Sequence, residues 1–401
     1  MRYLRFLQSL GPGLLYAGAA IGVSHLVQST RAGAEYSWLP VLGIVFIHLA
    51  KFPFFKMGPE YASHTGENLV DAYRKLGNWA LFLFGFFTIG TMFAIIAAIV
   101  SVNAGIAGYI FNIDLEPSLV AGIVLIFAVA ILLIGNYTVL DRFINFVIIL
   151  LTISTMLAFV LSLKDGAGSA PVDLIFDGAF LVMMIKLMGW MPAPLDLSVW
   201  HSIWVVEKSK RQTYDFKKSM QDFKIGYWGT MIIGILFLGV GALVLYPSPN
   251  LPNGGVDFAN LFIGVYTSKL GAWTFGIVAF AALTTMFSTA LTCMDAIPRS
   301  LAELFKTQKH SAKKLYTPLL IILSAGSFIL LHFWAPGMLT MVDLATMLSF
   351  CATPVIAYLN LRSIRLVESR SVGSLYKFYT LTCFVLLSLF TIVFLFFYFG
   401  K

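Results

Sequence analysis

Long apolar segments constrain this chain more than any other feature of its sequence. A helix needs roughly 20 apolar residues to cross the hydrocarbon core of a bilayer. Segments of that kind cover residues 10–31, 38–55, 78–110, 116–134, 137–163, 176–205, 226–246, 271–297, 315–333, 337–361 and 378–399. They lack the two-residue alternation of barrel strands, and backbone groups in lipid must bond within their own segment. The sequence therefore predicts an all-α polytopic membrane protein with about 11 transmembrane helices.

The scarcity of charge excludes several other classes of protein. Only 11% of the 401 residues are charged, compared with about 25% in soluble domains. The net charge of +8 does not come with a solvated basic face, so we expect no nucleic-acid partner. The sequence shows no phosphate loop, zinc motif or nucleophile–base pair, and its three cysteines lie apart in apolar stretches. It therefore predicts no enzyme and no cofactor, and it carries no signal for an oligomeric state.

The distribution of positive charge predicts how the chain lies in the membrane. Most of the 27 lysines and arginines fall on alternate segments between spans, which become cytoplasmic when the N-terminus is placed inside. An odd number of spans then places the C-terminus outside, and an inner, plasma-type membrane is expected. The basic start of the chain resembles a signal peptide, but Gly11-Pro12-Gly13 would interrupt its apolar core, so we expect no cleavage. Segment 247–270 predicts an outer loop with a surface helix.

Two of the predicted spans contain a break. The first has Ile21-Gly22-Val23-Ser24-His25 at its centre, which combines a weak helix former with two polar side chains. In the sixth, Gly189 is followed by Pro192 and Pro194, and proline removes a backbone donor and clashes with the preceding turn. Helices broken at corresponding positions of two repeats mark the binding site of many secondary transporters. The alternative is a plain proline kink and a buried Ser/His pair.

The spacing of the breaks predicts the domain organisation. They lie five spans apart, which indicates a 5+5 inverted repeat within one transmembrane domain, 1–401. The first repeat would cover 1–163 and the second 176–361, with 378–399 as an additional helix.

Three patches of sequence resemble the Nramp (natural resistance-associated macrophage protein) metal-ion transporters. Gly11-Pro12-Gly13-Leu14-Leu15 through Arg31-Ala32-Gly33-Ala34 is similar to the family's first helix, which opens with Gly-Pro-Gly-aliphatic and closes with Gln-Ala-Gly-Ala. Thr65-Gly66-Glu67-Asn68-Leu69 resembles the Thr-Gly-Lys-Asp-Leu that follows its second helix. Met191-Pro192 resembles the Met-Pro of its sixth helix. The resemblance implies a LeuT-type fold with alternating access around helices 1 and 6.

The chain departs from the Nramp pattern where that family's chemistry lies. In place of Asp-Pro-Gly-Asn, whose Asp and Asn are metal ligands, it has Gly22-Val23-Ser24-His25. In place of Met-Pro-His-Asn it has Met191-Pro192-Ala193-Pro194. The family's third helix holds acidic residues for proton passage, whereas 78–110 has no charged residue. Of the usual ligand positions only Met191 is retained.

The candidate substrate site consists of groups at the two breaks. Its residues are Gly22, Ser24, His25, Met191, Ala193 and Asp196. Divalent metals prefer oxygen and nitrogen ligands with carboxylate charge, so one hypothesis is a metal site of His25, Met191 and Asp196. Asp196 is also explained as a first-turn acid favoured by the helix dipole. In the other hypothesis, the same groups and the half-helix N-termini hold a neutral solute or a small anion.

Further polar residues within the spans are candidates for gating or charge movement. Lys186 needs an anionic partner, for which Asp196, Asp343 and a substrate anion are available, unless it extends to the outer surface. Trp200 and His201 follow the second break and are candidates for an inner gate; alternatively, they pack near the interface.

Two basic residues of the second predicted span are expected to have structural rather than functional roles. Lys51 lies near the inner end of the predicted span 38–55, so its ammonium is expected to reach the inner surface. His48 is expected to be a hydrogen-bonded core histidine rather than a proton carrier.

The LeuT-type resemblance also implies a place for a coupling ion. In sodium-coupled members of that fold, hydroxyls of helix 8 and carbonyls of broken helix 1 hold a sodium ion. The span 271–297 contains Thr284-Thr285-Met286-Phe287-Ser288-Thr289, which makes Thr285, Ser288 and Thr289 candidate ligands. Alternatively, these hydroxyls bond the preceding turn of their own helix.

The sequence therefore predicts an Nramp-related secondary active transporter in a lipid bilayer, with a small ionic or small-molecule substrate at the breaks of helices 1 and 6. A divalent metal cation is the first hypothesis for that substrate. The second is a non-metal solute, a small anion or small organic molecule, with sodium coupling. A channel or a receptor would lack saturable, gradient-driven flux. A bound metal or sodium ion would be substrate or coupling ion rather than a resident cofactor.

Overall fold

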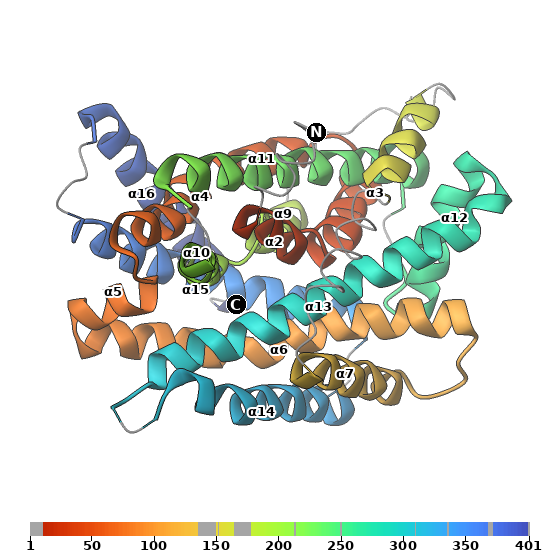
Figure 1. Ribbon diagram of the computed structural model, residues 1–401. Helices are drawn as coiled ribbons and strands as arrows, with labels where there is room; N and C mark the ends of the chain where they lie inside the picture. The colour runs from red at the N-terminus through yellow and green to blue at the C-terminus, as the bar shows by residue number, and fades with distance from the viewer. Residues whose placement is uncertain are drawn as a thin grey trace, which may run out of the picture.

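The chain is helical wherever its computed structural model describes it. The described residues are 11–134, 150, 152–163, 178–211, 214–248, 251–308, 310–334, 337–367 and 372–399, and within them every regular element is a helix (Figure 1). The first part holds α2 (Pro12–Ala20), the π-helical η1 (Ser24–Ser29), α3 (Thr30–Tyr36), α4 (Val41–Thr65), α5 (Leu69–Leu76), α6 (Asn78–Phe111) and α7 (Pro117–Ile134). The second part holds α9 (Gly178–Trp190), α10 (Leu197–Arg211), α11 (Phe216–Val240), η2 (Gly241–Leu245), α12 (Gly255–Leu270), η3 (Ala272–Thr274), α13 (Phe275–Phe305), α14 (Ala312–Phe333), α15 (Met338–Ile364) and α16 (Ser374–Phe399).

These helices account for the predicted spans. Within the described residues, eight continuous helices are long and apolar enough to cross a membrane. The first predicted span is divided into α2 and η1–α3, and the sixth into α9 and α10. Helix Thr152–Leu163 belongs to the fifth predicted span, whose residues 137–149 lie outside the described part, as does the basic segment 1–10. The prediction of an all-α polytopic membrane protein is confirmed.

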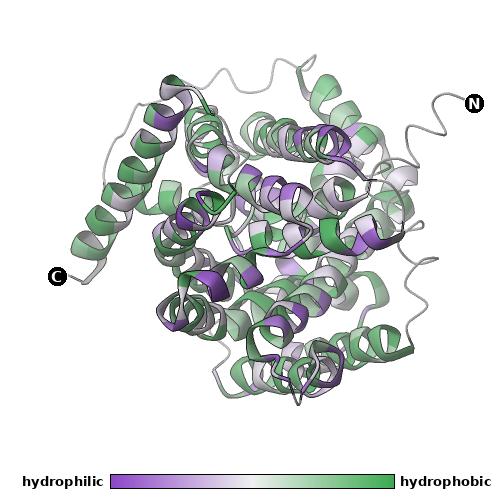
Figure 2. Cartoon of the chain, turned by 60° about the vertical axis from the view of Figure 1, so that its left-hand side comes forward, coloured by the Kyte–Doolittle hydropathy of each residue, from purple (hydrophilic) through white to green (hydrophobic). Residues whose placement is uncertain are grey.

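Burial separates central helices from peripheral ones. Most of α6 and α13 is buried, whereas α7, α14 and α16 expose most of their apolar side chains. In Figure 1, α2 and α9 lie near the middle of the bundle, and Figure 2 shows α16 at one edge, coloured as hydrophobic along most of its length. Exposed apolar side chains on the outer helices fit lipid contact, since lipid tails solvate them and water does not.

Several helices extend beyond their predicted ends. The apolar segment predicts a span over 38–55, but α4 continues to Thr65 and is followed by Gly66, whose φ of 71° is the left-handed conformation that glycine adopts readily. The added turns contain Glu60, which pairs with Lys56 at 3.5 Å. Likewise α11 begins at Phe216 rather than 226, and α13 ends at Phe305 rather than 297. The ends of these helices are amphipathic and carry charged residues. The length of an apolar segment therefore underestimates the length of the helix that contains it.

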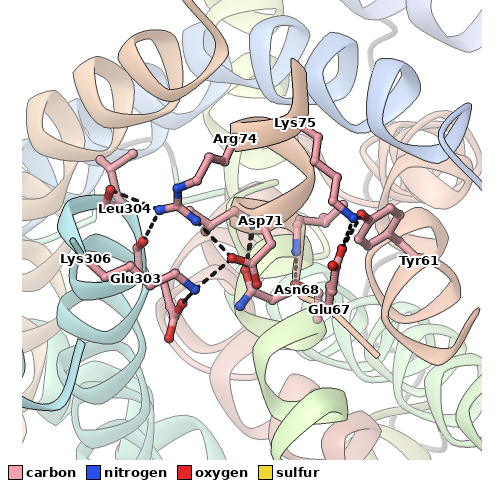
Figure 3. Close-up of polar contacts among 12 residues, drawn as sticks. Tyr61, Glu67, Asn68, Asp71, Arg74, Lys75, Glu303, Leu304 and Lys306 are labelled. Carbon is pink, nitrogen blue, oxygen red and sulfur yellow. Dashed lines mark hydrogen bonds and ion pairs between the residues drawn. The ribbon is translucent and has the colours of Figure 1, made fainter. Parts of the chain in front are cut away.

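The motif that follows α4 caps a short helix and joins it to α13. Asn68 accepts hydrogen bonds from the backbone nitrogens of Val70 and Asp71, at 2.9 and 3.1 Å, and so begins α5. Asp71 pairs with Lys306 at 2.7 Å, and Arg74 donates to the carbonyl oxygen of Glu303 at 2.6 Å (Figure 3). Although burial lowers the pKa of Lys306, its hydrogen bonds to Asp71 and Glu303 raise that pKa above the ordinary value. This end of the bundle is thus fixed by ion pairs.

Candidate functional site

The first break lies between α2 and η1. The helical hydrogen bonds stop where the nitrogen of Gly22 bonds the carbonyl of Ala20 at 3.0 Å, and the helix resumes at Ser24. A β-carbon on Gly22 would lie 2.7 Å from Oγ1 of Thr289, so only glycine allows α13 to approach the break this closely.

The second break lies between α9 and α10, where Pro192 and Pro194 supply no backbone donor. The carbonyls left free at the end of α9 are taken by one side chain. Nζ of Lys51 donates to the carbonyl oxygens of Met188, Gly189 and Ala193, at 2.8, 2.9 and 3.3 Å. Lys51 is fully buried, so the expectation that it reaches the inner surface is wrong. The physical reason is the length of α4, which places Lys51 in the middle of the helix rather than at its end.

A small pocket lies between the two breaks. The space within it that is open to water-sized molecules is about 20 Å³, room for about one water. Its lining residues are Ala19, Ala20, Val23, Ser24, Ile95, Ile99, Trp190, Ala193, Pro194, Leu197, Trp200, Thr289 and Cys293. The pocket is therefore too small for a solute in this conformation, and its lining is mostly apolar. Of the candidate substrate residues, it brings together Ser24 and Ala193, with Thr289 and Trp200 beside them.

His25 and Met191 lie together, but away from the lining of this pocket. A β-carbon placed on Gly234 of α11 would lie 3.4 Å from Sδ of Met191 and 3.6 Å from Cδ2 of His25. Nδ1 of His25 is 2.7 Å from Oγ of Ser24, and Nε2 is 3.0 Å from the carbonyl oxygen of Thr230. A carbonyl only accepts, so Nε2 carries the proton and Nδ1 is left to the serine hydroxyl. Both ring nitrogens are engaged.

Asp196 does not join His25 and Met191. It is 4% exposed, and within the described residues its carboxylate forms no hydrogen bond or ion pair. Burial raises the pKa of the Tyr73 hydroxyl on α5 well above its ordinary value, and the charge of Asp196 adds to that rise. Across the described part of the chain, no group of three or more His, Cys, Asp or Glu side chains is placed to hold a metal ion.

Of the proposed inner-gate residues, Trp200 lines the pocket and His201 lies in an aromatic cluster. The ring of His201 is 5.7 Å from that of Tyr16 and 5.8 Å from that of Phe223. Neither ring nitrogen of His201, nor Nε1 of Trp200, nor the hydroxyl of Tyr16 has a hydrogen-bond partner among the described residues. Buried polar groups without partners are uncommon, so this cluster is where bound water or a moving solute would be accommodated.

The candidate sodium ligands lie against the first break. Oγ1 of Thr289 is 3.2 Å from the carbonyl oxygen of Gly18, 3.1 Å from that of Ile21 and 3.2 Å from that of Thr285. The hydroxyl of Thr285 is buried without a partner in the described part of the structure. Ser288, which precedes Thr289 in the sequence, is also buried. Carbonyls from two helices thus converge on one hydroxyl.

Asp343 of α15 joins the second half of helix 1, η1–α3, to α9. Its carboxylate pairs with Lys186 at 2.6 Å and with Arg31 at 3.0 Å, and it accepts a hydrogen bond from Gln28 at 3.2 Å. Of the partners considered for Lys186, the structure has Asp343. We call Gln28, Arg31, Lys186 and Asp343 the Asp343 cluster.

The opposite end of helix 1 has a latch that the sequence did not reveal. Asp222 of α11 accepts hydrogen bonds from the backbone nitrogens of Gly11 and Gly13, at 3.1 and 2.8 Å, and from the hydroxyl of Tyr214 at 2.6 Å. We call these four residues the Asp222 latch. The free N–H groups at the start of a helix attract a carboxylate, so the sequence did indicate that an acid could bind there. It did not indicate which acid, because Asp222 lies 209 residues from Gly13. The Asp343 cluster and the Asp222 latch thus fasten both ends of the broken helix.

Comparisons with known proteins agree with this architecture. The chain is 33% identical over 380 residues to the uncharacterized protein PM0681 of Pasteurella multocida (strain Pm70), covering 92% of this chain and 87% of that protein. No family model matches the chain. Among solved structures, a manganese transporter of Eremococcus coleocola matches with a TM-score of 0.65 at 15% identity, covering 96% of this chain and 85% of that one.

Transporters of other substrates match equally well. MhsT in complex with L-phenylalanine has a TM-score of 0.67 at 15% identity, covering 95% of this chain and 96% of that one. A Na⁺-coupled sialic acid symporter has a TM-score of 0.60 at 14% identity, covering 88% of this chain and 78% of that one. At such identities the likeness shows the fold alone, and that fold is of the LeuT type.

Proposed function

The chain belongs to the same family as the uncharacterized protein PM0681 of Pasteurella multocida and has a LeuT-type fold, and we propose on this basis that it is a secondary active transporter of a small non-metal solute. The observation that carries the proposal is the small pocket between the two broken helices, which is bordered by both breaks. Substrate sites of inverted-repeat transporters lie at such breaks.

The chemistry of the pocket favours an organic solute over a metal ion. Its lining is largely apolar, with two tryptophans and the hydroxyls of Ser24 and Thr289. Desolvating a divalent ion requires charged or strongly coordinating ligands, whereas both nitrogens of His25 are engaged and Asp196 is not among the residues that line the pocket. The N-terminal ends of η1 and α10 border the pocket and would favour a carboxylate or another anionic group of the solute.

A soft divalent metal is the second candidate substrate. The specific observation in its favour is that the thioether of Met191 and the ring of His25 border the same glycine, Gly234. Binding there requires that His25 release Ser24 or Thr230, and that a further ligand be supplied.

We propose sodium as the coupling ion, held by Thr289 and the carbonyls of Gly18, Ile21 and Thr285. Three carbonyl oxygens already lie within 3.2 Å of the Thr289 hydroxyl oxygen. Unwound helix 1 carbonyls are the oxygens that transporters of this architecture offer to sodium. Without Thr289 the α13 side of this arrangement loses its hydroxyl ligand and keeps only the carbonyl of Thr285.

A stability screen tests both parts of the proposal. The purified protein is heated with small organic acids, amino acids, nucleobases and manganese, each in sodium and in choline. A bound solute stabilises the folded state by mass action, so we expect one organic class to raise the melting temperature by about 3 °C, more in sodium than in choline. A shift with manganese alone would contradict the proposal.

Thr289→Val should abolish the sodium effect while keeping the side-chain volume. Thr292→Val is the matched control, because the Thr292 hydroxyl bonds only its own helix, at the carbonyl of Ser288. An unchanged sodium effect in Thr289→Val would contradict sodium binding at Thr289. It would not affect the proposed solute site.

A further inference from the structure

Lys51 is the most unusual buried group of the described structure. It lies in the middle of α4 with none of its surface exposed, and within the described residues no carboxylate pairs with it. Its three hydrogen bonds all go to backbone carbonyls at the second break. A buried lysine without a counter-ion is costly unless its surroundings favour the charge.

The geometry fits an ammonium better than a neutral amine. An ammonium has three N–H donors and no acceptor, and three carbonyl oxygens surround Nζ. A neutral amine would have only two donors, so its lone pair would face a carbonyl oxygen. The carbonyls of Met188 and Gly189 are also at the C-terminal end of α9, where the helix dipole is negative.

This arrangement is the one that a bound cation occupies in transporters with broken helices. There, unwound carbonyls and the C-terminal ends of half-helices coordinate the coupling ion. We propose that the Lys51 ammonium is a tethered cation that permanently fills a monovalent cation position at the end of α9. The inference rests on the proposed function in taking this break as part of the substrate site.

The tethered cation bears on substrate class. Ala193, whose carbonyl accepts from Lys51 at 3.3 Å, also lines the pocket. The pocket wall therefore has a fixed positive charge behind it, which repels a metal ion and attracts a solute with a negative group. The second break needs no ion of its own, and any sodium would act only at the first break.

Chemical rescue tests this inference without a known substrate. Lys51→Ala removes three carbons and the nitrogen, which together correspond to propylammonium. The melting temperature of Lys51→Ala is measured with propylammonium chloride, with propan-1-ol as the uncharged analogue, and with sodium chloride at equal ionic strength. Lys56→Ala is the matched control, because Lys56 lies on the same helix but pairs with Glu60.

We expect propylammonium to raise the melting temperature of Lys51→Ala saturably, by about 3 °C or more, with no effect of propan-1-ol. The wild type and Lys56→Ala should not respond. An equal response of all three proteins, or none in Lys51→Ala, would overturn the proposal.

Lys51→Gln decides the question if Lys51→Ala cannot be purified. Its amide keeps two donors and the side-chain bulk but lacks the charge, so we expect a melting temperature lower by about 3 °C or more. Wild-type stability of Lys51→Gln would show that the charge is dispensable and would overturn the proposal. These readouts concern the cation position alone, so their failure is distinct from failure of the solute screen.

Discussion

Hydrogen-bond partners decide what single residues at the breaks can bind. In His25, both ring nitrogens form hydrogen bonds with neighbouring groups, so neither is free for a ligand. In Lys51, the ammonium donates to three backbone carbonyls, so these oxygens are not free for an ion. Thr289 keeps a hydroxyl among carbonyls of two helices. A residue type alone therefore does not identify a ligand, because its neighbours determine which lone pairs are free.

Gly22 is predicted to be intolerant of even one methyl group. In Gly22→Ala the added β-carbon would lie 2.7 Å from Oγ1 and 2.8 Å from Cγ2 of Thr289. Overpacking of this kind costs about 1–3 kcal/mol, and it would also push α13 away from the first break. Thermal unfolding should show the loss, together with a weaker sodium effect.

Gly229→Ala is the control for that substitution. It also lies within a helix, α11, but apart from its own stretch of helix backbone no atom of the described structure lies within 4 Å of the position of its β-carbon. Alanine favours helix over glycine, so stability should be unchanged or slightly higher. If both variants behave alike, close packing at the first break is not what Gly22 provides.

At the scale of elements, sequence reasoning found the breaks and missed what holds them. Gly22, Pro192 and Pro194 interrupt a helix through backbone geometry, which residue type predicts. The acceptors of Lys51 are backbone carbonyls more than 130 residues away, and any residue supplies such a group. Helix ends were misplaced because amphipathic turns such as those of α4 after residue 55 are not apolar.

The Asp343 cluster is predicted to act as a gate between helix 1, α9 and α15. Asp343→Asn leaves Lys186 and Arg31 without their shared carboxylate. These side chains are partly exposed, so the full penalty of a buried pair does not apply. We expect the pocket to open about ten times more often, which corresponds to about 1.4 kcal/mol.

A native cysteine reports that opening. Cys293 lines the pocket, and replacing Cys351 and Cys383 by serine leaves it as the single thiol. A small thiol reagent should then label Cys293 about tenfold faster in Asp343→Asn. Glu35→Gln, which loses only the neighbouring pair with Arg31, should have a much smaller effect. Equal rates in all three proteins would contradict a gating role.

The Asp222 latch is predicted to control the other end of helix 1. In Asp222→Asn the amide loses the negative charge that the N–H groups of Gly11 and Gly13 favour. Hydrogen bonds to a charged group contribute about 1.5–3 kcal/mol each, so α2 should detach more readily and expose Cys293. Asp215→Asn is the control, because Asp215 caps only its own helix at Lys218. Faster labelling in the control alone would exclude the latch.

At the scale of the molecule, the bundle combines a buried centre with a fastened helix 1. Outer helix α14 packs against α6 and α13, outer helix α16 packs against α15 and α4, and broken helix 1 has one fastening at each of its ends. Release of one fastening at a time would open the pocket to one side, as alternating access requires. The 5+5 repeat and the cytoplasmic N-terminus stay predictions from the sequence.

Uptake by proteoliposomes under an imposed sodium gradient tests the central claim most directly. The vesicles are incubated with a defined mixture of small organic acids, amino acids and manganese, and the lumen is then analysed by mass spectrometry. The account predicts that one organic class accumulates saturably, only with the gradient and not in Thr289→Val vesicles. Saturable entry of manganese without accumulation of any organic solute would contradict it.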